Sequence, residues 1–254
     1  MKPTTPRRAV LLHLAVIAAY AAGVVALLGP IPFDRAVWGS QSDVGDHFYL
    51  MTWQARETAR GNPFPVENRE LQFPDSGAIW LVDPVGGLFA TPFYWLLGAP
   101  AAYNIMVAAD LVFACWAMFW LVRRRTGDLA AAIASGWLFG VSPFMLANVH
   151  NGLTESLQAG WLPIFLGALL TLLDRAEEDA PWKRFILPAV ATAAAWWIVT
   201  ISGHWYHGIY AGVLFGLVTA TRLARRPHVR TGAAASGSSG ALFDPHRSGR
   251  FGLR

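Results

Sequence analysis

Residues 104–127 read NIMVAADLVFACWAMFWLVRRRTG, an apolar run that ends abruptly in three consecutive arginines. The part over 104–122 is long enough to cross the hydrocarbon core of a bilayer as one helix, which takes about 20 residues. Basic residues collect in the cytoplasmic loops of membrane proteins, so Arg123, Arg124 and Arg125 place the end of this helix in the cytoplasm. This stretch predicts a membrane protein and its orientation.

The composition agrees with a membrane protein. Apolar residues make up 54% of the 254 residues and charged residues only 14%, whereas a soluble domain carries about 25% charged residues. The formal net charge is +4, but its distribution over the loops indicates membrane topology, so we expect no nucleic-acid partner. The single cysteine, Cys115, excludes an intrachain disulfide and a cysteine zinc site.

Five further apolar blocks are long enough, or nearly so, to cross the bilayer. We therefore predict an all-α polytopic membrane protein with six transmembrane helices, near 9–28, 104–122, 129–147, 157–173, 185–201 and 205–221. A seventh apolar stretch, 84–102, is broken by prolines and glycines. Membrane helices tolerate such residues, so the breaks alone do not exclude a crossing.

Loop charges decide the number of crossings. Lys2, Arg7 and Arg8 precede the first block and the arginine triplet follows the second, so an even number of crossings must separate them. We therefore place 84–102 along the membrane interface. The later basic residues then all fall inside: Arg175, Lys183, Arg184, Arg222, Arg225, Arg226 and Arg230. This predicts an integral protein of the bacterial inner membrane with a cytoplasmic N-terminus.

The two ends of the chain differ in kind. The first block runs unbroken from Ala9 to Leu28, longer than the 7–15 apolar residues of a secretory signal, so we expect a retained anchor. Residues 231–254 are rich in Gly, Ala and Ser and lack periodicity, so we expect a disordered cytoplasmic tail behind a membrane domain over 1–230. The abrupt change suggests that a longer protein was cut or its reading frame lost.

The outer loop over 29–103 holds eight of the sixteen acidic residues, interleaved with aromatic residues. Within it, 47–60 (HFYLMTWQARETAR) has the spacing of a short helix, with Phe48, Met51, Ala55 and Ala59 on one side. We expect this side to lie on the bilayer surface. Asp46 occupies the N-cap position and Gly61 the C-terminal cap position of the predicted helix.

Asp46 has two compatible interpretations. A capping carboxylate stabilises a helix by about 1 kcal/mol, and a carboxylate at a fixed place can also act as a general base or a metal ligand. Asp43 supplies a second carboxylate and His47 an imidazole. Such a group can bind a divalent cation or transfer a proton.

Three other polar groups are candidates. The outer loop over 148–156 carries His150 and Glu155, and His204 and His207 are spaced to share a helix face. Each also has a plain interpretation, as a capping loop or as part of an aromatic belt at the interface. Asp110 lies inside the second span, where a carboxylate should face the bundle interior.

Four stretches resemble a known family: SDVGDHFYLMTWQARETARGNPFP at 42–65, PFYWLLGAPAAYN at 92–104, RRRTG at 123–127 and SPFMLANVHNGLTESLQAGWLP at 142–163. Together with the topology, they resemble the N-terminal part of GT-C fold membrane glycosyltransferases, which use polyprenyl-phosphate sugars. The resemblance covers roughly residues 8–221. These enzymes are usually much longer, so the resemblance leaves two alternatives: a short enzyme that is active alone, or a truncated first half that is not.

The resemblance implies roles for particular residues. Asp46, with Asp43 second, matches the acid of the first outer loop that acts as catalytic base, and Glu155 with His150 completes the site. His47 and His204 would contact substrate. Arg69 would hold the phosphate of a lipid-linked sugar donor. Some members also need a divalent cation, and Asp43 and Asp46 would then ligate Mg²⁺ or Mn²⁺.

The alternative is a non-enzymatic multispan membrane protein, such as a transporter component or an assembly partner. Membrane lipids are expected partners under either interpretation. Transporter sites lie near the bilayer midplane, often on broken helices. Here the polar residues collect on the outer face, and of the acidic residues and histidines only Asp110 and His13 lie more than one helical turn inside a predicted span. This distribution favours a surface-facing site.

Overall fold

The computed structural model describes residues 6–30, 34, 43–68, 70, 77–78, 81, 83–178, 181–202 and 205–225. These residues form an all-α protein with one short antiparallel hairpin. The elements are α1 (Pro6–Leu28), α2 (Asp43–Ala59), β1 (Glu67–Asn68), β2 (Gly77–Ala78), α3 (Pro84–Leu97), α4 (Ala99–Thr126), α5 (Leu129–Gly140), α6 (Pro143–Asn151), α7 (Thr154–Leu157), the 3₁₀ turn η1 (Gln158–Gly160), α8 (Trp161–Glu177), α9 (Lys183–Ser202) and α10 (Trp205–Arg225).

Five helical stretches in the described part of the chain are long and apolar enough to cross a membrane: Arg7–Leu28, Ala99–Thr126, Leu129–Asn151, Thr154–Glu177 and Lys183–Ser202. They lie where five of the six spans were predicted, and they are consistent with an integral membrane protein. The sixth predicted block also forms a helix, α10, but it is not among these five. Its first turn carries Tyr206 and His207 and its last turn Arg222, which lower its apolarity.

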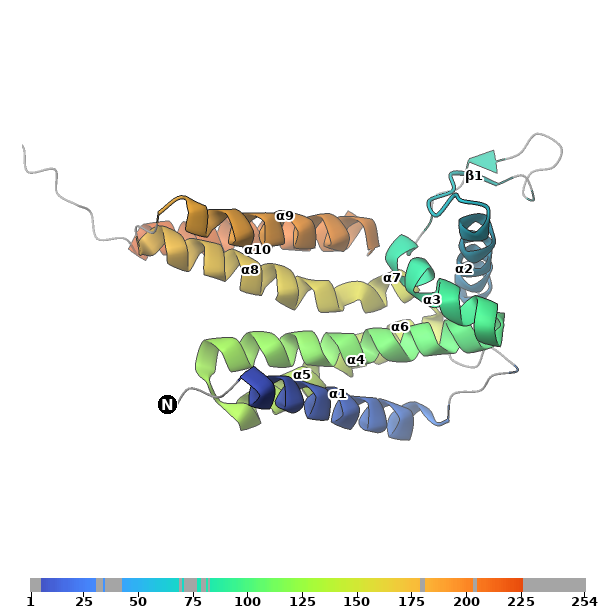
Figure 1. Cartoon of the computed structure of the whole chain (residues 1–254), viewed down its shortest axis with the longest axis horizontal. Helices are drawn as coiled ribbons and strands as arrows, with labels where there is room; N and C mark the ends of the chain where they lie inside the picture. Colours follow the sequence, from blue (N-terminus) through green and yellow to red (C-terminus); the bar gives the residue numbers. More distant parts are fainter. Residues whose placement is uncertain are drawn as a thin grey trace, which may run out of the picture.

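The long helices lie side by side, and α2 lies across one end of them (Figure 1). We call this the α2 end. Helix α4 runs through the middle of the bundle and contacts α1, α3, α5 and α8, while α9 and α10 pack against α8. The start of α1 lies at the opposite end (Figure 1). Helices α3, α6 and α7 also lie near the α2 end (Figure 1).

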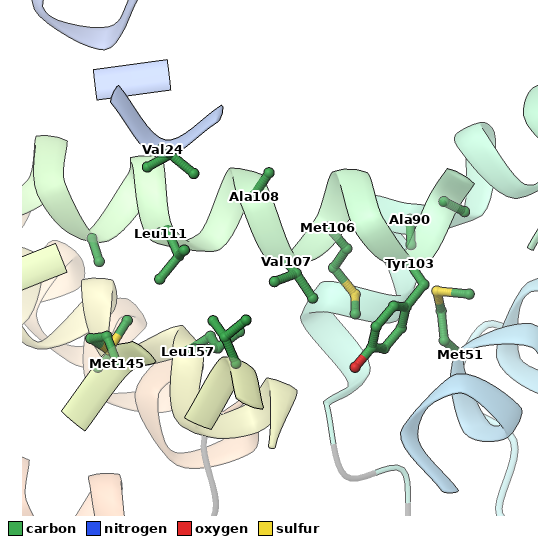
Figure 2. Packing of buried hydrophobic residues seen from close by; sticks show 14 residues of the cluster. Val24, Met51, Ala90, Tyr103, Met106, Val107, Ala108, Leu111, Met145 and Leu157 are labelled. Carbon is green, nitrogen blue, oxygen red and sulfur yellow. The ribbon is translucent and has the colours of Figure 1, made fainter. Parts of the chain in front are cut away.

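Side chains of α4 form the centre of the main hydrophobic cluster (Figure 2). Tyr103, Met106 and Leu111 are almost fully buried. They pack against Val24 of α1 and Leu157 of α7, among others. Contacts from helices far apart in the chain therefore converge on one helix.

Helix α2 differs from its prediction in two respects. It begins at Asp43, so Asp46 lies inside its first turn and is not the N-cap. Met51 and Ala55 do not lie on the bilayer surface but are buried against α3 and the start of α4. The reason is that Tyr103 and its neighbours offer an apolar surface there: the rings of Phe48 and Tyr103 are 5.9 Å apart.

The apolar stretch 84–102 forms two helices and not one interfacial segment. Gly98 separates them with φ of +87°, a conformation that favours glycine. Helix α3 stops before it, and α4 begins at Ala99, five residues before the predicted start of the span. Helix α3 is not among the five candidate spans, and Trp95 and Leu96 expose apolar surface near its end.

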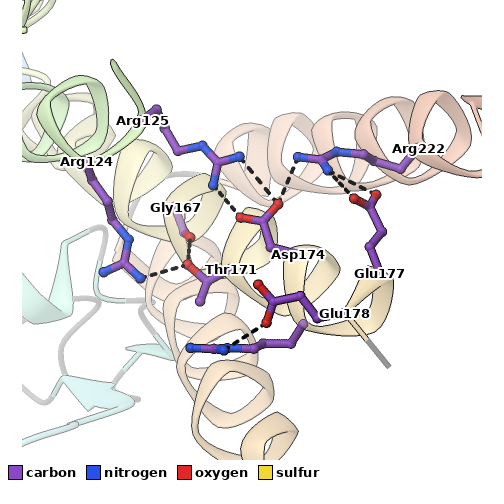
Figure 3. A network of polar contacts seen from close by, with 9 residues as sticks. Arg124, Arg125, Gly167, Thr171, Asp174, Glu177, Glu178 and Arg222 are labelled. Carbon is purple, nitrogen blue, oxygen red and sulfur yellow. Dashed lines mark hydrogen bonds and ion pairs between the residues drawn. The ribbon is translucent and has the colours of Figure 1, made fainter. Parts of the chain in front are cut away.

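An ion-pair network ties together α4, α8 and α10 at the end opposite α2 (Figure 3). Arg125 approaches Asp174 to 2.5 Å, and Arg222 lies 3.1 Å from Asp174 and 2.9 Å from Glu177. Arg124 donates to the Thr171 hydroxyl at 3.3 Å. Three of the arginines that were predicted to share one side of the membrane, Arg124, Arg125 and Arg222, therefore lie at one end of the bundle, which we call the arginine end.

Helices α4 and α5 approach closely at Gly140, and we expect Gly140→Ala to lower stability. A Cβ there would lie 2.6 Å from the backbone nitrogen of Cys115 and 2.9 Å from its Cα, so the backbones must separate. Overpacking of this kind costs about 1–3 kcal/mol. The measurement is the thermal unfolding temperature in detergent.

Gly216→Ala in α10 is the matched control. A Cβ at this glycine would meet no atom within 4 Å, so only the higher helix propensity of alanine acts and the unfolding temperature should not fall. An unchanged unfolding temperature for Gly140→Ala would contradict the close packing of α4 on α5.

Candidate functional site

Four titratable side chains from four separate elements meet under α2. His47 comes from α2, Asp83 immediately precedes α3, Asp110 lies on α4 and Glu155 lies on α7. Gln158 of η1 lies between two of the acids. The site is therefore assembled from α2, the start of α3, the segment that follows α6 and the central helix α4.

The imidazole of His47 is held by the segment that follows α6. Its Nδ1 lies 2.8 Å from the hydroxyl oxygen of Thr154 and 3.3 Å from a carboxylate oxygen of Glu155. Glu155 is 1% exposed and His47 8%. A buried carboxylate is costly unless it is paired, so the contact with His47 offsets part of the cost of burying Glu155.

The turn at Gly152 brings these two segments together. Its φ is +78°, and a Cβ there would lie 2.7 Å from the backbone nitrogen and Cα of Val44 in α2. Only glycine allows this close approach. The contact between His47 and Glu155 thus depends on the close approach of the turn at Gly152 to the backbone of α2.

Asp83 caps α3 and has an unusual acidity. Its Oδ1 accepts a hydrogen bond of 2.8 Å from the Gly86 amide. Burial raises the pKa of Asp83 and the nearby carboxylate of Glu155 also raises it, while the hydrogen bond from Gly86 lowers it; the resulting pKa is about 7. A carboxyl group with a pKa near neutrality can both give and accept a proton under physiological conditions.

Asp110 faces the bundle interior, as predicted, and is 7% exposed. The Gln158 amide donates to its Oδ1 at 2.9 Å and lies 3.5 Å from Asp83 Oδ2. The indole of Trp161 donates to the Gln158 oxygen at 3.2 Å, which orients the amide. Gln158 therefore links Asp83, at the start of α3, with Asp110 on α4.

A small cavity of about 10 Å³ lies beside two of these groups, His47 and Asp83, and is also lined by Gln54, Thr154 and apolar side chains such as Leu50 and Met106. This is close to the volume that one water molecule needs. Buried carboxyls with shifted pKa values beside an imidazole are typical of sites that transfer protons. The arrangement is suited to acid–base chemistry at the membrane surface.

The other predicted site residues lie around this cluster or outside the described residues. Asp46 is exposed and Asp43 partly buried on the first turn of α2, and His150 is exposed on the last turn of α6. Arg69 and His204 lie outside the described residues. No three His, Cys, Asp or Glu side chains among the residues that the structure describes are grouped to hold a metal ion, so Mg²⁺ or Mn²⁺ at Asp43 and Asp46 stays a prediction.

Sequence reasoning missed Asp83, Thr154, Gln158 and Gln54 as site residues. Gln54 donates to the carbonyls of Pro63 at 3.0 Å and Pro84 at 2.9 Å, and so fixes α2 against the start of α3. For Asp83 a signal was present, because an acid directly before a proline marks a helix start. The amides gave no signal, since glutamine in an apolar helix has no distinctive pattern.

No protein-family model matches this chain, and no curated protein and no solved structure matches it. The functional argument therefore rests on the geometry of the site and on the motifs in the sequence.

We expect the stability of the protein to fall as the pH rises through the interval set by Asp83. Between the ordinary pKa of 3.8 and about 7, the folded protein keeps a proton that the unfolded chain has released. Each increase in pH within this interval therefore favours unfolding. Asp83→Asn should reduce this dependence, and asparagine can still cap α3. The measurement is the unfolding temperature of both proteins between pH 4 and 8.

Asp128→Asn is the control, because Asp128 caps α5 in an exposed position at the arginine end. It should keep the pH dependence of the parent. An equal pH dependence in the parent and Asp83→Asn would show that Asp83 does not hold this proton.

Proposed function

We propose that this chain is a membrane glycosyltransferase of the GT-C type, which transfers a sugar from a lipid-phosphate carrier to an acceptor at the outer face. The observation that carries the proposal is the contact between His47 and Glu155. It joins the first and the second outer segments, and these are the two segments to which the resemblance assigns the site. The raised pKa of Asp83 beside them supports proton transfer as the chemistry.

The exposure of the acids suggests a division of roles. Asp46 is exposed one residue before His47, so its carboxylate is accessible to an acceptor from the aqueous side, with Asp43 second. Glu155 is 1% exposed and acts by holding His47. His150 is exposed at the end of α6, and the proposal keeps it as a substrate contact. The proposal keeps Arg69 as the phosphate ligand and His204 as a substrate contact.

In the proposed step the acceptor hydroxyl oxygen attacks the anomeric carbon of the sugar. The bond between that carbon and the phosphate oxygen breaks, and the lipid phosphate leaves with the bonding electron pair. The hydroxyl proton passes to the Asp46 carboxylate. His47, fixed by Thr154 and Glu155, donates a hydrogen bond within the site.

The fold supports a lipid-linked donor. Helix α2 lies across the end of the bundle (Figure 1), and the apolar end of α3 beside it exposes Trp95, Leu96 and Leu97. A surface of this kind lies naturally at the level of the lipid headgroups. A donor whose lipid stays in the bilayer can thus present its sugar beneath α2.

We also propose six crossings, with α10 as the sixth and the N-terminus in the cytoplasm of a bacterial cell. Helix α10 packs along α8 and α9, and Arg222 reaches Asp174 and Glu177 at the arginine end. Its outward side exposes Ile209, Val213 and Leu217, which suits contact with lipid. Both the N-terminus and the end of α10 then lie on the cytoplasmic side.

We expect Asp46→Asn to lower transfer 10²–10⁴-fold, the usual contribution of a general base. The assay incubates the purified full chain with polyprenyl-phosphate-linked hexoses and pentoses and measures release of polyprenyl phosphate. Asp128→Asn, remote from the site, should transfer at the rate of the parent. Undiminished transfer by Asp46→Asn would remove this residue as the base. Absence of transfer by the parent would favour the non-enzymatic alternative.

Glu155→Gln tests the positioning role separately. The variant keeps the shape of the side chain but weakens the hold on His47, so we expect a smaller loss of rate together with a shifted pH profile of transfer. A lowered rate with an unchanged pH profile would contradict action through the imidazole.

The position of α10 can be tested with single cysteines and a membrane-impermeant maleimide. Thr221→Cys and Tyr206→Cys lie near opposite ends of α10 and are exposed, while the native Cys115 is buried. If α10 crosses the membrane, Thr221→Cys reacts from the same side as an Arg8→Cys reference and Tyr206→Cys from the other side. Reaction of both from one side would contradict a sixth crossing.

A further inference from the structure

A second pocket, of about 220 Å³, lies between α3, α4 and the start of α8. Its walls are mainly apolar and aromatic: Val85, Phe89, Ala109, Phe113 and Trp161. The rings of Phe113 and Trp161 are 4.8 Å apart. Phe89 is 45% exposed, so the pocket reaches the surface of the bundle beside this ring. The pocket is distinct from the small cavity under α2.

The polar part of this pocket consists of Asp110 and Gln158. Gln158 is fully engaged, because its amide nitrogen donates to Asp110 Oδ1 and its oxygen accepts from Trp161. Among the described residues, no group forms a hydrogen bond with Asp110 Oδ2, although this atom is buried. An unsatisfied buried polar atom costs about 1–3 kcal/mol, which a ligand with a donor group would recover.

The side chains around the pocket determine which charge a ligand can carry. Asp83 and Asp110 approach the same Gln158 amide nitrogen, at 3.5 Å and 2.9 Å, and the lining residues of the pocket include no Lys, Arg or His. A phosphate or carboxylate would be repelled by these acids. A cation would be attracted both by the carboxylate of Asp110 and by the faces of Phe113 and Trp161.

We propose that this pocket binds the ammonium group of an amphiphilic amine. The ammonium donates to Asp110, and the apolar part of the amine packs against Phe89, Phe113 and Trp161. The inference does not rest on the transfer reaction, because Asp46, His47 and Glu155 do not line this pocket. Binding can therefore be present whether or not sugar transfer is found.

The test measures equilibrium binding of radiolabelled 2-phenylethylammonium to the purified full chain in nanodiscs of phosphatidylglycerol. Unlabelled 2-phenylethanol and phenylacetate serve as neutral and anionic competitors of similar size. We expect saturable binding of the amine, weak competition by the alcohol and none by phenylacetate. Competition by phenylacetate equal to that by the unlabelled amine would overturn the proposal.

Asp110→Asn removes the charge while the asparagine oxygen can still accept from Gln158. We expect it to weaken amine binding at least 10-fold and to leave the affinity for the alcohol unchanged. Asp128→Asn at the arginine end should bind the amine like the parent. Equal amine affinity in the parent and Asp110→Asn would overturn the proposal.

Ala109→Leu provides a second variant that does not alter charge. Ala109 lines the pocket, so the larger side chain should exclude both the amine and the alcohol while the unfolding temperature stays within the range of the parent. Undisturbed amine binding in a folded Ala109→Leu protein would place the amine elsewhere and overturn the proposal.

The same ammonium chemistry occurs in lipid headgroups and in free amines, and the lipid composition separates these sources. If the headgroup of phosphatidylethanolamine is the ligand, nanodiscs of this lipid should compete with the labelled amine. If a free amine is the ligand, binding should be equal in both kinds of nanodisc. Either result supports an ammonium site, whereas absence of saturable binding in both lipids would overturn it.

Discussion

The bundle depends on the burial of α4, a membrane-length helix that carries a carboxyl group at Asp110. An apolar interior cannot hold such a group without partners. The structure meets this constraint with Gln158, whose amide is oriented by Trp161 and donates to Asp110. Helices α3 and α8 must pack closely on α4 to bring these groups together. Gly160 shows how close they come, since a Cβ there would lie 2.6 Å from the Phe113 ring and 3.0 Å from the Cα of Ala114.

The two ends of the bundle use charge in different ways. At the arginine end, Arg125 and Arg222 share Asp174 in partly exposed ion pairs. Each pair adds little stability in water, but together the pairs connect three helices. Under α2, Asp110 and Glu155 are buried, and the pKa of the neighbouring Asp83 is raised, so this acid keeps its proton to a higher pH. This difference explains why the proposed chemistry lies at the α2 end, with Asp83 titrating near neutrality.

Much of the fold followed from local patterns. Long apolar blocks and the basic loops located five helices that can span a membrane, and Gly61 was correctly predicted as the end of α2, since its φ is +86°. The prediction for the start of α2, with Asp46 as its N-cap, was wrong. Asp43, Asp46 and neighbouring Ser and Asp residues offer several capping positions within one turn. The prediction of one interfacial segment over 84–102 was wrong in detail. Proline and glycine can each break a helix or lie at its end, and only the conformation of Gly98 shows that one helix ends and another begins there.

The sequence by itself determined the class of protein, the order of its helices and the location of its acids outside or inside the apolar blocks, because hydropathy and charge act locally along the chain. It also suggested His47 and Glu155 as site residues. Only the tertiary structure decided that these two are partners, that Asp83 and Asp110 share one glutamine, and that Asp46 stays exposed. Such pairings depend on contacts between residues up to 108 positions apart, such as His47 and Glu155. They are set by the close approach of backbones at Gly152 and by packing on α4, and no local pattern records either of them.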